Sequence, residues 1–270
     1  MQSYRDIQES NMPKRVVTLI KRYLQPGEMF TAITNREWEY SVENQKEFAV
    51  RDRAMMALSF CSAGRISEVV GGPIYEWNNL EQKAHRVKAK QHLGIQVENL
   101  SFNEERILLS GMEVVKRSRK MIEKYGPQIT VRDDFAIPLK CGLYDNPFWD
   151  QLVPFGWLVL EYMKKSAPQK GKLFPFASTR AYQIINFVTG NYPNWFRAQA
   201  EHFYGHFLLT DTVKLSKFVK IQDPKHVKHY IGYSWTEQLK DKSLAMDFNW
   251  IEPSKEKIKT NIEKWSEKTA

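Results

Sequence analysis

The sequence contains only two cysteines, Cys61 and Cys141, among its 270 residues. Two cysteines so far apart provide neither a disulfide framework nor a zinc site, which indicates a reducing compartment. The N-terminal residues lack the apolar stretch of a secretory signal, and no apolar run approaches the length of a membrane span. We therefore expect a cytoplasmic or DNA-associated protein with no membrane partner.

Positive charge is what the sequence has in excess. It carries 40 Lys and Arg against 31 Asp and Glu, a net charge of +9 and a pI of about 9.3. This balance favours a polyanionic partner, first of all nucleic acid, with an anionic membrane surface or no such partner as alternatives. The 42% of apolar and 13% of aromatic residues exclude a disordered chain.

The spacing of apolar residues divides the chain into helical and extended parts, without internal repeats. We expect a basic helical segment over residues 1–42, in which Pro26 and Gly27 end a helix. Residues 43–70 predict helix with a break at Ala63 and Gly64, residues 85–140 a small antiparallel sheet, and residues from 147 onward helices again. A tail helix is expected over 249–270. The fold class predicted is α+β, mainly helical, with a small antiparallel β-sheet.

Two arginines stand at the beginnings of predicted helices. Arg65 follows a glycine in the apolar stretch "FCSAGRISEVV", and Arg197 follows a turn in "NWFRAQAEHF". A cation at a helix N-terminus opposes the macrodipole unless an anion lies with it. Glu68 and Glu201 are possible internal partners. The alternative is that both guanidinium groups bind one phosphate, whose oxygens match their geometry.

Three segments resemble the tyrosine recombinases of the phage-integrase family. "RDRAMMALSFCSAGRISEVVGG" is similar to the first signature of that family, in which an apolar helix precedes an Arg-Ile-Ser-Glu type of sequence. "NWFRAQAEHF" resembles the second signature, especially the form found in archaeal integrases. "DPKHVKHYIGYSW" resembles the segment with the Leu-Gly-His-Ser motif. The order and spacing agree over residues 45–248.

The resemblance implies a catalytic domain over residues 43–248 that performs site-specific DNA recombination or integration. In this reaction a tyrosine attacks the phosphodiester, and neither cofactor nor metal takes part. The partners implied are double-stranded DNA and further copies of the chain on that DNA. The site residues implied are Arg65 and Arg197 as the phosphate clamp, Lys116 as general acid, Asn194, Tyr233, and Phe248 at the nucleophile position.

Further basic residues are candidates for DNA contacts. They are Lys88, Lys90, Arg117, Lys225, Lys228 and His229. Lys88, Lys90, Arg117 and Lys120 are also alternatives to Lys116 as the general acid. His202 and His206 are four residues apart, but no third ligand is evident near them, so we expect no metal site.

Three positions depart from the pattern of the family. Asn194 stands where the family has histidine, and Tyr233 where it has histidine or tryptophan. Phe248 has no hydroxyl to attack with, and no tyrosine follows Tyr233 in the sequence. The chain is then a natural DNA-binding protein that does not cut (a regulator or the remnant of an integrated element), or a recombinase with an engineered phenylalanine. The remaining alternatives are attack by Tyr230 or Tyr233, and a basic helical protein that acts on RNA.

Overall fold

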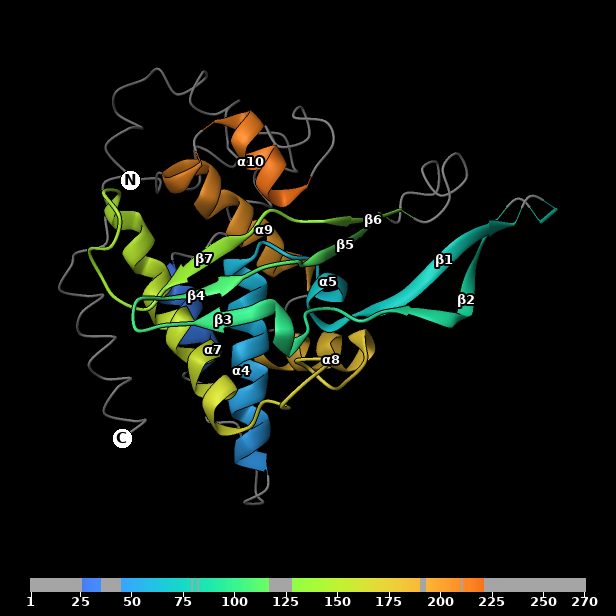
Figure 1. The fold of residues 1–270 in the computed structure, drawn as a ribbon, viewed down its shortest axis with the longest axis horizontal. Helices are drawn as coiled ribbons and strands as arrows, with labels where there is room; N and C mark the ends of the chain where they lie inside the picture. Colours follow the sequence, from blue (N-terminus) through green and yellow to red (C-terminus); the bar gives the residue numbers. More distant parts are fainter. Residues whose placement is uncertain are drawn as a thin grey trace, which may run out of the picture.

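The structure, a computed structural model, combines helices with small antiparallel sheets (Figure 1). It describes residues 26–34, 45–78, 80–81, 83–116, 128–189, 193–209 and 211–220. Helices come first and last along the described chain, and the strands lie between them in sequence. This order is that of an α+β protein, as the sequence predicts.

The core surrounds one helix, α4 (Gln45–Cys61), whose second half is buried on every side. All side chains from Ala54 to Cys61 are at most 1% exposed, so neighbouring elements must cover each face of this half. The ring of Phe60 lies 4.9 Å from that of Phe155 and 6.0 Å from that of Phe203. The helices that pack against α4 include α3 (Pro26–Thr34), α7 (Val153–Lys165) and α9 (Asn194–Phe203).

Helix α3 was not predicted from the sequence. The helix that Pro26 and Gly27 are predicted to end lies outside the described residues, and Pro26 is itself the first residue of α3. The fixed φ and missing N–H of proline are tolerated at this position, so proline begins helices as well as ending them. Met29 and Ile33, one turn apart, are fully buried in the same core as α4.

The predicted break after α4 is present, and α5 (Ile66–Val70) follows it. The left-handed residue is Ala63, with φ of 47°, and not the glycine beside it. Gly64 is needed for space, because a Cβ there would lie 2.8 Å from Ser62 Oγ and 2.9 Å from Met112 Cε. Both residues together reverse the chain between the two helices.

The strands form three small antiparallel sheets, where the sequence predicted one over residues 85–140. The first begins earlier than expected and is the hairpin of β1 (Gly72–Asn78) and β2 (Lys83–His92). After a 3₁₀ turn (Val97–Asn99), the second sheet contains β3 (Leu100–Phe102), β4 (Arg106–Leu109) and β7 (Phe135–Pro138). The third contains β5 (Glu113–Lys116) and β6 (Gln128–Val131).

The predicted return to helices after residue 147 is confirmed for the residues described. The elements are a 3₁₀ turn η2 (Pro147–Leu152), α7, α8 (Ser178–Thr189), α9, a π-helical turn η3 (Tyr204–Leu208) and α10 (Thr212–Val219). Tyr204 joins this part to α4, because its hydroxyl donates a hydrogen bond to the carbonyl of Cys61. No helix among the residues described is long and apolar enough to cross a membrane.

Candidate functional site

Arg65 immediately precedes α5 and is joined to Glu68, in the first turn of that helix. Its backbone N–H donates to Glu68 Oε2 at 2.9 Å, and its Nη1 lies 2.6 Å from Glu68 Oε1. The first of these bonds satisfies a backbone donor that the helix itself cannot pair. The Arg65 side chain is 42% exposed, whereas that of Glu68 is 2% exposed. Glu68 thus holds the guanidinium from the protein side, and part of it faces solvent.

Arg197 lies in the first turn of α9 and is almost fully buried. Its Nε donates to Glu201 Oε1 at 2.6 Å, and its Nη2 donates to the carbonyl of Val219 at 2.8 Å. Its Nη1 lies 3.7 Å from Glu68 Oε2 and has no hydrogen-bond acceptor among the described residues. The two arginines singled out in the sequence therefore meet at one carboxylate, that of Glu68.

A third arginine, Arg132, belongs to the same cluster and was not found from the sequence. It follows β6 and is 3% exposed. Its Nε donates to the carbonyl of Phe218 at 3.1 Å, its Nη2 donates to the same oxygen, and its guanidinium lies 5.0 Å from the centre of the Phe218 ring. Burial, with a smaller contribution from Arg197, lowers the pKa of Arg132 to about 10.

Among the described residues, the buried Arg132 and Arg197 are balanced by the buried Glu68 and Glu201, and the partly exposed Arg65 adds one further positive charge to the cluster. Burial raises the pKa of Glu201, although the three arginines oppose that shift. The excess positive charge and the solvent-facing guanidinium of Arg65 make this cluster suited to binding an anion from outside.

His92 connects the arginine cluster to the strands. It ends β2 and its side chain is fully buried. Its Nδ1 lies 3.1 Å from the carbonyl oxygen of Ser67 in α5, and its Nε2 lies 3.2 Å from that of Glu113 in β5. Strand β5 is thereby held beside the helix that Arg65 precedes. Lys116, the candidate general acid, is the last residue of β5 and pairs with Gln128 of β6, and only its backbone is described.

The other predicted site residues are only partly described. Asn194 is the exposed first residue of α9, one turn before Arg197. Lys88 and Lys90 lie in β2, and only the backbone of these two residues is described. Outside the described residues are Arg117, Lys120, Lys225, Lys228, His229, Tyr230, Tyr233 and Phe248. In the part of the chain that is described, no three His, Cys, Asp or Glu side chains gather where they could hold a metal ion.

Comparison of the chain with models of protein families, with curated protein sequences and with solved structures finds no match. The features that bear on function are the arginine cluster, the strands beside it and the positive charge of the chain.

Proposed function

We propose that the protein binds duplex DNA and holds one backbone phosphate at the arginine cluster, on a recombinase-type domain. The observation that carries this proposal is the meeting of Arg65 and Arg197 at Glu68, from positions far apart in the sequence. A guanidinium binds two phosphate oxygens at once, and two such groups fixed beside each other suit one tetrahedral phosphate. The net charge of +9 supports the same class of partner.

Glu68 has a supporting role in this proposal. It contacts both guanidinium groups from inside the protein, so neither arginine needs to reorganise when the phosphate arrives. The phosphate meets Arg65 first, because that side chain is the exposed one. Arg197 Nη1, for which the described part of the chain offers no hydrogen-bond acceptor, supplies further positive potential behind it.

In the recombinase reaction a tyrosine oxygen forms a bond to phosphorus while the bond to the 5′-oxygen breaks. The leaving 5′-oxygen takes a proton from a general acid, for which Lys116 is the candidate. The arginines stabilise the charge that spreads over the non-bridging oxygens. No residue is assigned to supply the attacking oxygen, because Phe248, which has no hydroxyl, stands at the nucleophile position. That residue favours a second candidate, a protein that binds DNA through the same cluster and does not cut it.

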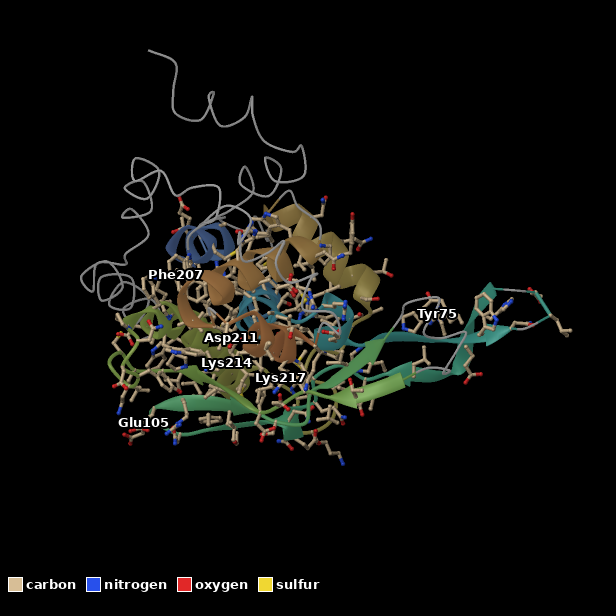
Figure 2. All side chains as sticks on the ribbon, turned by 90° about the horizontal axis from the view of Figure 1, so that it is seen from above. Tyr75, Glu105, Phe207, Asp211, Lys214 and Lys217 are labelled. Carbon is tan, nitrogen blue, oxygen red and sulfur yellow. The ribbon has the colours of Figure 1, made fainter. Side chains whose placement is uncertain are left out.

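The binding step is tested by fluorescence anisotropy with a labelled duplex over a series of salt concentrations. Arg65→Ala should weaken binding about tenfold and reduce the salt slope by about one. The matched control is Arg106→Ala, which removes an exposed arginine at the start of β4 that is likewise paired with a glutamate, Glu105. Figure 2 shows Glu105 on the body, far from the β1–β2 hairpin. Equal binding by the two variants and the unchanged protein would contradict a phosphate at Arg65.

The cutting step is tested with end-labelled, nicked duplexes of randomised sequence, denatured in detergent after incubation. Label that migrates with the unchanged protein would identify a nucleophile other than Phe248, with Tyr230 and Tyr233 as the first candidates for replacement by phenylalanine. Label that migrates only with Phe248→Tyr would support a DNA-binding protein that lacks one oxygen. If neither protein forms an adduct but both bind the duplex, the second candidate function stands.

A further inference from the structure

The hairpin of β1 and β2, which we call the arm (residues 72–92), projects from the helical body. It extends away from the helices in both views, and Tyr75 lies along it (Figure 2). The 7 residues of β1 give it a reach of about 23 Å at roughly 3.3 Å per residue. The major groove of B-form DNA is about 12 Å wide and 8.5 Å deep and admits a two-stranded ribbon. The arm therefore has the form and length to enter that groove.

The base of the arm is fixed to the body beside the arginine cluster. Gly71 and Gly94 flank the arm with φ of 81° and 76°, and the two chain segments cross so closely that a Cβ on Gly94 would lie 2.3 Å from the nitrogen of Gly71. Ile95 donates its N–H to the carbonyl of Val69 at 2.9 Å, and His92 binds α5 and β5. The direction of the arm is thus set relative to α5 and to Arg65.

Positive charge is concentrated on one strand of the arm. The β2 sequence, "KAHRVKAKQH", has four Lys or Arg and no acidic residue. The acidic residues of the arm are Glu76 in β1 and Glu81 in the turn, and Glu81 Oε2 lies 2.8 Å from His85 Nε2. Arg86 is exposed and lies opposite Tyr75, so these two side chains share one face of the ribbon. Lys88 and Lys90 follow Arg86 at alternate positions along β2.

We propose that the arm enters the major groove of the same duplex whose phosphate Arg65 holds. This proposal rests on the proposed function and adds a second contact to it, at bases or phosphates displaced from the arginine cluster by the length of the arm. A strand rich in lysine suits a polyanion and disfavours pairing with the edge of another protein's sheet. A-form RNA does not fit, because its major groove is too deep and narrow for the ribbon.

The test compares two variants that each remove three positive charges. The arm variant is Arg86→Ala, Lys88→Ala and Lys90→Ala. The control variant is Lys140→Ala, Lys164→Ala and Lys165→Ala, which changes residues after β7 and at the end of α7, away from the arm (Figure 1). With a labelled 30-base-pair duplex we expect the arm variant to lose about tenfold or more in affinity and two to three units of salt slope. The control variant should lose less than half as many units of salt slope as the arm variant.

The groove that the arm occupies is identified with dimethyl sulfate, which methylates guanine N7 in the major groove and adenine N3 in the minor groove. The unchanged protein should protect guanine N7, and the arm variant should lose that protection while adenine N3 stays as it was. Protection of adenine N3 that depends on the arm would overturn the proposal in favour of the minor groove. Equal affinity and equal protection for the arm and control variants would exclude the arm from the complex.

The two proposals fail in different ways. If the unchanged protein binds no duplex, the proposed function fails and the arm proposal fails with it. If it binds, and Arg65→Ala weakens binding but the arm variant does not, only the arm proposal fails. Tighter binding of the unchanged protein to a 30-base-pair RNA duplex than to DNA would contradict both. Each variant should have the same melting temperature as the unchanged protein, which confirms that the binding measurements compare folded proteins.

Discussion

The guanidinium of Arg197 and the carboxylate of Glu201 lie one turn apart on α9, with 2.6 Å between Nε and Oε1. The two side chains are 8% and 1% exposed, so each depends on the other for its charge to be tolerated inside the protein. Glu68 is the second acidic neighbour of Arg197, at 3.7 Å. The free energy of this arrangement can be measured, because each member can be replaced by an apolar residue of similar length.

Replacing Arg197 by methionine should lower the free energy of unfolding by about 3–5 kcal/mol, because Glu201 is left buried without its main partner. The double variant Arg197→Met with Glu201→Leu should recover at least about half of that loss, since no unpaired charge remains between them. Urea unfolding followed by circular dichroism measures both values. A loss below about 1 kcal/mol in the single variant would mean that the pair is open to water.

Helix α10 should depend on the carboxylate of Asp211. Its Oδ1 accepts the backbone N–H groups of Val213 at 2.6 Å and Lys214 at 3.1 Å, and these bonds lower the pKa of Asp211. Figure 2 shows Asp211 near Lys214 and Lys217 of this helix. Asp211→Ala should lower the melting temperature by about 2 °C at pH 7, and Asp211→Asn, which keeps an accepting oxygen, by less.

The difference in melting temperature between the unchanged protein and Asp211→Ala should depend on pH, in a way that follows from the lowered pKa of Asp211. A pKa that is lower in the folded than in the unfolded chain stabilises the fold at every pH above the unfolded value, about 3.8 here. The stabilisation is lost as the pH falls below that value. The gap in melting temperature between the unchanged protein and Asp211→Ala should therefore stay constant from pH 7 to 5 and narrow below pH 4. A gap that narrows already at pH 6 would point to a different group.

Gly94→Ala should destabilise the protein far more than Gly142→Ala. Both glycines have positive φ, 76° and 74°, so alanine is strained at both. A Cβ on Gly142 would have no atom of the described residues within 4 Å, whereas one on Gly94 would meet Gly71 N at 2.3 Å and Val69 O at 2.6 Å. We expect about 1 kcal/mol for Gly142→Ala and at least about 3 kcal/mol for Gly94→Ala by urea unfolding. Equal losses would show that the base of the arm can open.

The two cysteines should differ sharply toward a thiol reagent. Cys61 is fully buried in α4, and burial raises its pKa, so its reactive thiolate is scarce. Cys141 is exposed, although partial burial raises its pKa as well. With dithionitrobenzoate one thiol should react in the native protein and two in urea. The variant Cys141→Ser should show no reaction until the protein unfolds, and a fast native reaction of that variant would contradict the buried position of Cys61.

The helices of the core could be predicted from the sequence because their apolar spacing reflects burial. The stretch from Ala54 to Cys61, the break at Ala63 and the helices after residue 147 all carry that signal. The arm carried a weaker signal. Apolar and polar residues alternate over residues 75–78 and over residues 86–90, but these runs are too short to mark both strands, and the sheet was predicted only from residue 85 onward.

The candidate site was predictable in part for a similar reason. Arg65 and Arg197 stood out because each interrupts an apolar stretch at the start of a helix, and Glu68 and Glu201 stood at the right distances to pair with them. Arg132 closes the charged insertion "KRSRKMIEKYGPQITVR" and is followed by two aspartates, and among so many charges one more arginine is not conspicuous. Its burial depends on the carbonyl of Phe218, 86 residues away, and no local pattern encodes that contact.

Arg132 also links two parts of the structure that are far apart in the sequence. Its backbone N–H donates to the carbonyl of Met112 beside β5, and its guanidinium binds the end of α10 at Phe218. The hairpin of β5 and β6 and the last turn of α10 are therefore tied through one residue. A force that displaces this hairpin is transmitted to the last turn of α10.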